Sequence, residues 1–110
     1  MAWTIDEALD DDLIHLDNRN DDLGVYEFRV GELSKIVTVL LSRLPTSDRA
    51  RFYRSHNIKT PAQTYQYSQN STIWDDLPYA LHQAVNGITS HYRHAVEKGL
   101  VPADSWLVES

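Results

Sequence analysis

Apolar residues recur at helical spacing in the first part of the chain. Steps of four, four and three residues separate them, which would place them on one helix face; they are Ile5, Leu9, Leu13 and Leu16. The segment 4–7, Thr-Ile-Asp-Glu, has the form of a capping box and is flanked by apolar residues at the two staple positions. The sequence therefore predicts a first helix that begins at Thr4 and ends before the polar run 18–22.

Two patterns follow in the middle of the chain. Residues 25–30 alternate between apolar and polar positions, with Tyr26, Phe28 and Val30 on one side, and this period predicts a short strand. Positions 33–44 carry apolar residues at helical spacing up to Pro45, whose ring would stop a helix. We expect a second helix over 33–44, although its β-branched residues also suit a strand.

Three further helices are expected toward the C-terminus. Thr46 or Ser47 can cap a short basic helix that ends near 56–57, and the segment 60–63, Thr-Pro-Ala-Gln, begins another. The longest helix is expected over about 76–98, with Pro78 in its first turn and Gly99 where it ends. The tail 105–108 is apolar enough to dock on the core or on a partner.

These elements together predict one domain over 1–110, a mainly all-α bundle of four or five helices with one short extended segment at 25–30. The chain has 110 residues, of which 42% are hydrophobic, with four Gly and four Pro. That length matches a single ordinary domain, and that composition is typical of folded proteins. No repeat is evident.

Composition excludes several kinds of chemistry. The chain has no cysteine, so disulfides, thiolate metal sites and a cysteine nucleophile are excluded. No stretch has the length of a membrane-spanning helix, and the N-terminal residues do not have the form of a signal peptide. We therefore expect a cytoplasmic protein that does not enter a membrane.

Charge is distributed unevenly along the chain. Residues 1–32 hold ten acidic and two basic side chains, whereas residues 33–70 hold one acidic and six basic side chains. The formal net charge of the whole chain is −6. Segregated charge of this kind creates surface potentials that attract partners of opposite sign.

The acidic segment gives the leading functional hypothesis, which is a non-catalytic protein-binding module that regulates or inhibits a larger, basic protein partner. The carboxylates expected to bind this partner are Asp6, Asp10, Asp11, Asp12 and Asp17. No cofactor is expected. The sequence does not determine the oligomeric state, and a homodimer is compatible with it.

The basic segment gives an alternative, a small DNA-binding regulator. Segments 47–57 and 60–69 resemble a helix-turn-helix in outline, with arginines to neutralise phosphates and polar side chains to contact bases. The side chains assigned to this role are Arg49, Arg51, Arg54, Gln63 and Tyr65. Nucleic acid is therefore an alternative partner.

Catalytic motifs are absent from the sequence. His91 and His94 stand at i and i+3 of the expected long helix and could chelate one ion, which would make a metal-dependent enzyme a third interpretation. No third ligand is evident, and we assign neither catalytic nor metal-binding residues. The acidic run 17–24 does not fit a calcium loop, because Arg19 falls at a ligand position. Asp75 and Asp76 are interpreted as acids at a helix start.

Overall fold

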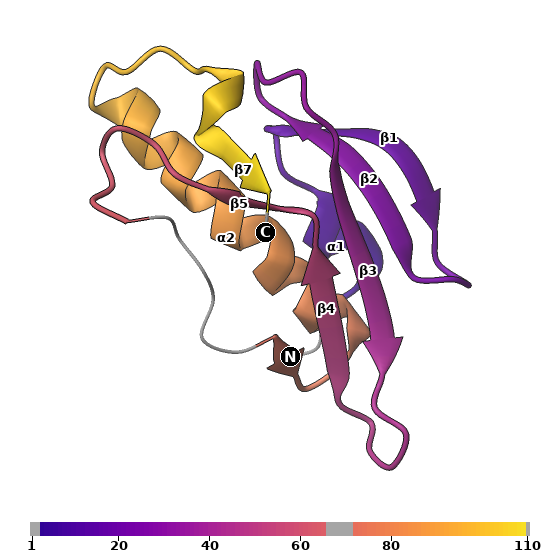
Figure 1. The fold of residues 1–110 in the computed structure, drawn as a ribbon. Coiled ribbons are helices and arrows are strands. Elements are labelled where there is room, and N and C mark those ends of the chain that lie inside the picture. Colours follow the sequence, from indigo (N-terminus) through magenta and orange to yellow (C-terminus); the bar gives the residue numbers. More distant parts are fainter. Residues whose placement is uncertain (1–2, 66–71, 110) are drawn as a thin grey trace.

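A computed structural model describes residues 3–65 and 72–109 of the chain (Figure 1). The elements follow in the order α1 (Ile5–Leu9), β1 (Ile14–Asn20), β2 (Val25–Val30), β3 (Val37–Arg43), β4 (Ala50–Arg54), β5 (His56–Ile58), β6 (Ile73–Trp74), α2 (Leu77–Glu97), the short 3-10 turn η1 (Asp104–Trp106) and β7 (Leu107–Glu109). Most of these elements are strands. The expected all-α bundle is therefore wrong.

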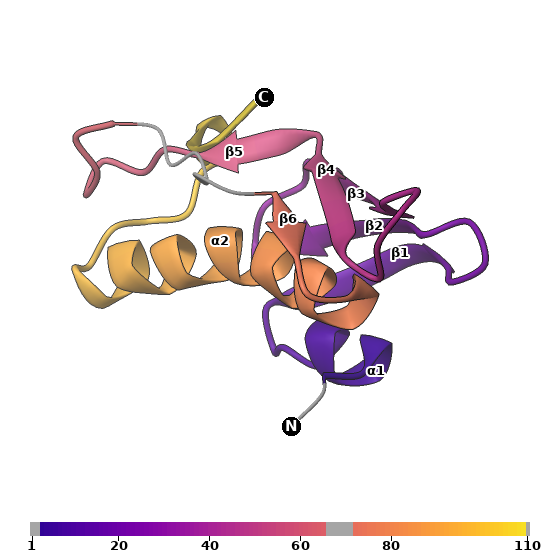
Figure 2. The ribbon, with the colours of Figure 1, turned by 90° about the horizontal axis from the view of Figure 1, so that it is seen from below.

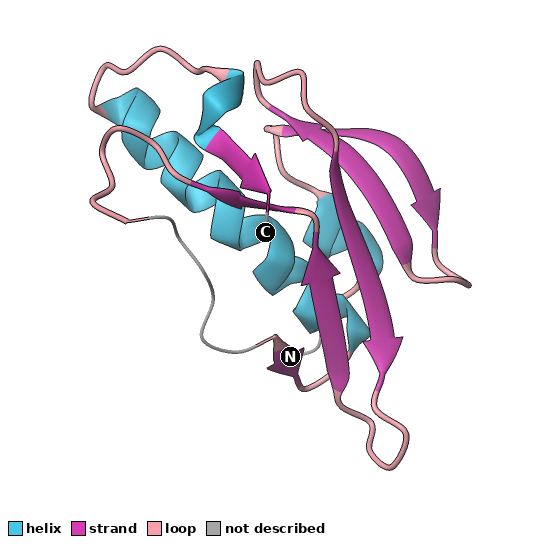
Figure 3. Cartoon of the chain, viewed as in Figure 1, coloured by secondary structure: helices cyan, strands magenta, loops and turns pink. Residues whose placement is uncertain are grey.

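The strands form two antiparallel sheets. The larger sheet has five strands in the order β1-β2-β3-β4-β6, and β5 pairs with β7 in a separate two-stranded sheet. Helix α2 lies along one face of the larger sheet, and α1 packs beside α2 (Figures 1 and 2). Figure 3 distinguishes the long helix α2 from the strands of the two sheets. Among the described residues, no helix lies against the outer face of the larger sheet (Figure 2).

The core lies between the sheet and α2. Tyr26, Phe28 and Val30 alternate along β2 with exposed fractions of 1%, 0% and 0%. The strand predicted at 25–30 is thus confirmed, and its apolar side faces the core as its alternation indicated. Seven of the apolar positions expected along the long helix are at least partly buried against this sheet, whereas Val96 is 43% exposed.

The helix predicted at 33–44 is wrong, because β3 occupies residues 37–43. Val37, Val39 and Leu41 alternate inward with exposed fractions of 0%, 0% and 7%, while Leu40 points outward and is 42% exposed. The β-branched run 37–39 favours the strand, and pairing with β2 on one side and β4 on the other satisfies its backbone.

Helix α1 begins as predicted, since Thr4 caps it and forms a capping box with Glu7. It ends at Leu9 rather than near residue 16. Three consecutive acids follow at 10–12, and negative charge opposes the negative end of a helix dipole. Residues 14–20 form β1, the exposed edge strand of the sheet, whose register shifts between Leu16 and Asn18.

The two helices expected over 47–69 do not form in the described residues. Residues 50–54 and 56–58 are β4 and β5, and 61–62 form only a turn. The capping interactions expected at Thr60 exist, since its N–H donates to Gln63 Oε1 at 2.8 Å, but the chain does not continue as a helix through Tyr65. The rest of that predicted helix, 66–69, lies outside the described residues.

The long C-terminal helix is confirmed. Asp76 caps α2 by accepting a hydrogen bond from the Tyr79 N–H at 2.9 Å, Pro78 stands in the first turn and Gly99 follows the end with φ +84°. The tail then returns to the core, where Trp106 and Leu107 are 3% and 1% exposed. The apolar tail therefore docks on this chain's own core.

Candidate functional site

The five acids proposed for partner binding come from three different elements. Asp6 lies on α1, Asp10 is its C-cap residue, Asp11 and Asp12 lie in the turn before β1, and Asp17 lies on β1. They do not form the single acidic helix face that the sequence suggested. Asp6, Asp10 and Asp12 nevertheless lie at the same end of the molecule and are exposed.

Arginines neutralise three of these acids within the chain. Asp6 pairs with Arg19 at 2.7 Å, Asp11 with Arg93 at 2.5 Å and Asp17 with Arg29 at 3.0 Å. None of these arginines belongs to the basic middle segment of the sequence. Within residues 3–65 and 72–109, no salt bridge involves Asp10 or Asp12. These two carboxylates therefore carry the most available negative charge of the five.

The Asp11–Arg93 pair ties the turn after α1 to helix α2. Both guanidinium nitrogens donate to the carboxylate, at 3.1 and 2.5 Å, and the Leu13 N–H donates to the same carboxylate at 2.9 Å. Burial opposes ionisation of Asp11, but these donors outweigh it and hold its pKa below the ordinary value. Asp11 therefore holds the turn after α1 in place, and its carboxylate is not free for a partner in the way that an unpaired surface acid is.

Helix α1 stands between two hollows of the surface. One has a volume of about 410 Å³, and its lining includes Asp6, Leu9 and Leu16. The other, between α1 and α2, has a volume of about 100 Å³. Glu7 and Asp10 line both hollows. The carboxylates of α1 therefore border two concave surfaces, each of which also has apolar lining.

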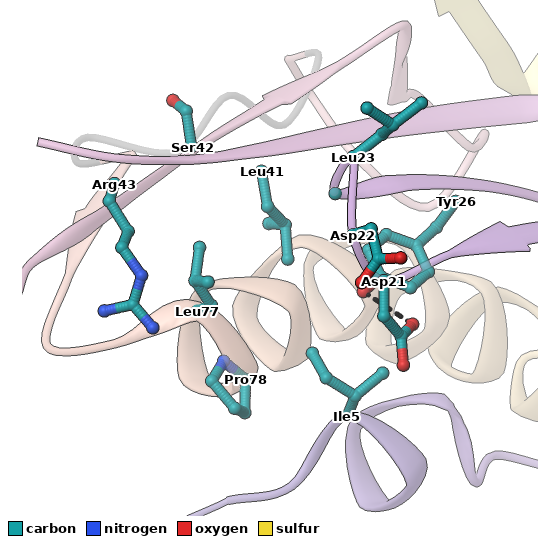
Figure 4. A pocket seen from close by; sticks show the side chains of 11 residues that line it. Ile5, Asp21, Asp22, Leu23, Tyr26, Leu41, Ser42, Arg43, Leu77 and Pro78 are labelled. Carbon is teal, nitrogen blue, oxygen red and sulfur yellow. Dashed lines mark hydrogen bonds between the residues drawn. The ribbon is translucent and has the colours of Figure 1, made fainter.

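A larger cleft of about 480 Å³ lies where the β1–β2 turn and the end of β3 approach the starts of both helices (Figure 4). Its size is within the range of small-molecule pockets. Apolar side chains make up much of its lining: Ile5, Leu23, Tyr26, Leu41, Leu77 and Pro78. Asp22 and Arg43 stand on opposite sides of it (Figure 4). This lining suits an apolar ligand group, but it contains no catalytic arrangement.

A hydrogen-bonded network closes one side of the cleft. The Tyr26 hydroxyl donates to Asp21 at 3.0 Å, and Arg19 bridges Asp21 to Asp6 of α1. Burial and the Asp21 carboxylate raise the pKa of Tyr26 to about 12, so the phenol stays protonated at neutral pH. The hydrogen bond from Arg19 keeps the pKa of Asp21 below its ordinary value. These groups hold the β1–β2 turn against α1.

The helix-turn-helix interpretation of the basic segment is wrong, because β4 and β5 replace its first helix and the described residues 60–65 of its second form no helix. Arg54 is only 5% exposed and donates to the His56 and Ala84 carbonyls, each at 2.8 Å. Within its own loop, the Gln63 side-chain amide donates to the Ile58 carbonyl at 3.1 Å and accepts from the Thr60 N–H at 2.8 Å. Both side chains are therefore structural.

Three other arginines remain exposed on the β3–β4 hairpin. Arg43, Arg49 and Arg51 form no ion pair in the described part of the chain. Tyr53 is 55% exposed on β4, and Tyr65 is 81% exposed in the loop after β5. The hairpin is thus a basic surface at the opposite end of the sheet strands from the α2 C-terminus (Figure 1).

The histidines proposed as a metal pair lie on α2. His91 Nδ1 is 3.2 Å from the Gly87 carbonyl oxygen one turn earlier, and His94 is exposed. The described residues contain no cluster of three or more side chains that could hold a metal ion. Asp76, as predicted, caps the helix start rather than joining a carboxylate pair.

Sequence reasoning missed the residues around the smaller hollow. Trp3 was expected to pack on α1, but its ring stacks on His82 of α2 at a centroid distance of 3.7 Å. Thr89 lines the same hollow. No sequence pattern could bring residues 3, 82 and 89 together, since their proximity depends on how α1 docks on α2.

Comparisons of the chain with protein-family models, curated proteins and solved structures find no match. Across the residues described, no helix combines the length and the apolarity that crossing a bilayer requires. What the chain does must therefore be inferred from its own residues.

Proposed function

We propose that the protein is a non-catalytic binding module that regulates or inhibits a basic protein partner through the surface around α1. The observation that carries this proposal is that Glu7 and Asp10 line hollows on both sides of α1. Asp6, although paired with Arg19, keeps 81% of its side chain exposed. Negative charge and concave shape thus coincide at one end of the molecule.

The larger hollow also offers apolar contact. Leu16 lines it and is 44% exposed, so apolar surface lies directly beside the carboxylates. Long basic side chains combine an apolar stem with a charged head, and they would bury the stem against Leu16 while the head meets Asp6 or Asp10. Complementary charge of this kind favours rapid encounter and selects against acidic partners.

The test compares two double variants with the same change in net charge. Asp10→Lys with Asp12→Lys reverses two carboxylates that form no salt bridge, so the fold should persist. Asp48→Lys with Glu97→Lys reverses two exposed acids far from α1 along the chain. Both variants and the natural sequence serve as baits for a lysate of the cells that make the protein, and captured proteins are then purified.

The proposal expects a basic protein whose direct binding to the Asp10/Asp12 variant is at least tenfold weaker, with unchanged binding to the Asp48/Glu97 variant. Equal loss in both variants would show an effect of net charge alone and would overturn the proposal. So would a captured protein that is acidic, or one that the Asp10/Asp12 variant binds as tightly as the natural sequence does.

We further propose a cytoplasmic location, which the absence of cysteine favours.

A second candidate function is binding to nucleic acid through the β3–β4 hairpin. The exposed arginines of this hairpin support it, because unpaired arginines can neutralise phosphates. Binding to random-sequence single- and double-stranded DNA at low salt, lost in Arg49→Ala with Arg51→Ala and weakened steeply by added salt, would support it. Absence of binding at low salt would remove it.

A further inference from the structure

The smaller hollow is a pocket between α1 and α2. Its volume is about 100 Å³, and its polar lining includes Glu7, Asp10, Asp11, Asn86 and Thr89. Ala8 and Val85 add apolar lining, and the stacked rings of Trp3 and His82 stand beside them. The pocket is thus apolar along part of its wall and acidic along another part.

Thr89 gives the pocket its most informative feature. The residue is 1% exposed, and its hydroxyl makes no hydrogen bond of normal geometry among the described residues, although it lies near enough to the Asp11 carboxyl to help lower the pKa of that group. Buried hydroxyl groups are nearly always paired, because leaving one unpaired in a folded protein costs free energy. A polar group that lines a pocket without a partner therefore indicates that something else supplies one.

The charges around this hydroxyl indicate the sign of the missing group. Glu7, Asp10 and Asp11 contribute three carboxylates, whereas Arg93 is the cation that binds Asp11. Burial lowers the pKa of His82, so its ring is neutral and adds no positive charge at neutral pH. The pocket therefore has an excess of negative charge and favours a cation.

The volume of the pocket and the arrangement of its oxygens indicate which kind of cationic group fits it. A pocket of about 100 Å³ exceeds the space of a single water but is small for most ligands. A guanidinium group binds best when a carboxylate offers both oxygens in one plane, and Arg93 already occupies both oxygens of Asp11. A compact ammonium has no such need and can donate separately to three oxygens.

We propose that this pocket binds a primary ammonium group on an aliphatic stem, namely a lysine side chain of the partner protein. The stem lies against Ala8, Val85 and the Trp3 ring, and the ammonium donates to Thr89 Oγ1 and to the carboxylates of Asp10 and Asp11. Aromatic faces attract cations, so the Trp3 ring adds to this attraction. The inference rests on the function proposed above and names the side chain that would anchor the partner.

The test uses small probes in place of the partner. Nα-acetyl-lysine methylamide, its norleucine counterpart without charge and its arginine counterpart are each titrated while backbone amide NMR shifts are recorded. We expect saturable shifts at residues 7–11 and 86–89 with the lysine probe, and binding at least threefold weaker for the other two. Equal shifts with norleucine, or no shifts with lysine, would overturn the inference.

Two substitutions at Thr89 separate binding from folding. Thr89→Val keeps the shape of the side chain but removes the hydroxyl, and it should weaken binding of the lysine probe at least threefold. Thr89→Ser keeps the hydroxyl and should bind the probe like the natural sequence. If both variants bind the probe equally, the hydroxyl is not a ligand of the ammonium group and the inference is overturned.

The two proposals can fail separately. In one outcome, Asp10→Lys with Asp12→Lys abolishes partner binding, but Thr89→Val changes neither the binding of the partner nor that of the probe. The acidic surface is then supported and the lysine pocket is ruled out. If the lysine probe binds in a Thr89-dependent manner but the Asp10/Asp12 variant still binds the partner, the pocket takes an ammonium group and the proposed function falls.

Discussion

The ring of Tyr92 occupies the place that a side chain on residue 31 would need. A Cβ added to Gly31 would lie 2.3 Å from the Tyr92 hydroxyl oxygen and 2.4 Å from Cζ. The backbone of Gly31 has φ +54°, and the neighbouring Glu32 N–H donates to the Tyr92 hydroxyl at 3.1 Å. This contact fixes the C-terminal half of α2 against the end of β2.

Gly31→Ala should therefore destabilise the protein strongly. Overpacking a dense contact costs about 1–3 kcal/mol, and the positive φ adds about 1–2 kcal/mol. Gly99→Ala is the matched control, because Gly99 has φ +84° but no atom within 4 Å of an added Cβ. In thermal unfolding, the loss of stability for Gly31→Ala should be at least twice that for Gly99→Ala. Equal losses of stability would contradict the close contact between residue 31 and Tyr92.

Arg54 should contribute to stability rather than to ligand binding. Its guanidinium donates to the His56 and Ala84 carbonyls and to Asn57 Oδ1, linking β4 to α2 and to β5. Arg54→Met removes donors from buried acceptors, and we expect a loss of about 3 kcal/mol in the free energy of unfolding. Arg51→Met, at an exposed position of the same strand, should change it by less than about 0.5 kcal/mol. Urea denaturation measures both.

Thr89→Val should raise stability even though it weakens binding of the lysine probe. The variant removes a buried hydroxyl without a partner, and relief of that cost is worth about 1 kcal/mol or more. The melting temperature in the absence of any probe is the measurement. A lower melting temperature would contradict this prediction and would mean that the hydroxyl stabilises the fold through its proximity to Asp11.

Stability should fall in mildly acidic solution because of His82. Burial lowers its pKa from the ordinary 6.5, so the unfolded chain takes up a proton at a higher pH than the folded chain does. The contribution of His82 to the free energy of unfolding is fully present above about pH 6.5. It is lost progressively as the pH falls toward the pKa of His82 in the folded protein. His82→Gln should flatten the pH dependence of the unfolding free energy in this window.

His94→Gln is the control for this measurement, because His94 is exposed at the other end of the same helix. The free energy of unfolding should still depend on pH in the His82→Gln variant because of His56, whose pKa is lowered by burial and by nearby Lys35. If His82→Gln and His94→Gln alter the slope equally, burial of His82 is not its cause.

The sequence predicted the elements whose local signals agree with their packing. Helix α2 carries a cap at Asp76, an early proline and a long apolar stripe, and β2 has a clear two-residue period. Both were therefore found with bounds close to those observed. The apolar tail was expected to dock on the core or on a partner, and the burial of Trp106 and Leu107 shows that it docks on the core.

The other strands could not be read from local pattern. The apolar residues before and along β3 imitate a helix stripe, yet Ile36 and Leu40 in that stripe are 47% and 42% exposed. Strand β1 is an exposed edge strand with little apolar alternation, so it resembles a polar helix end or a loop. In β4 an arginine takes the third inward position, which hides the two-residue period.

The sequence likewise predicted only part of the candidate site. The sequence identified the acidic segment but could not show that Arg19, Arg29 and Arg93 neutralise three of its carboxylates. The Asp6–Arg19 and Asp11–Arg93 pairs depend on how the β1–β2 hairpin and α2 meet α1 and the turn after it, whereas the Asp17–Arg29 pair depends on the pairing of β1 with β2. The pocket at Thr89 depends on the same docking.

The irregular edge at β1 has a consequence for the behaviour of the protein at high concentration. An open strand edge invites another chain to add to the sheet, and a long flat edge would let copies polymerise. The register shift between Leu16 and Asn18 interrupts the regular ladder, and Asp17 and Arg19 place charges along it. These features make β1 a poor template for a further strand, so they disfavour polymerisation through this edge.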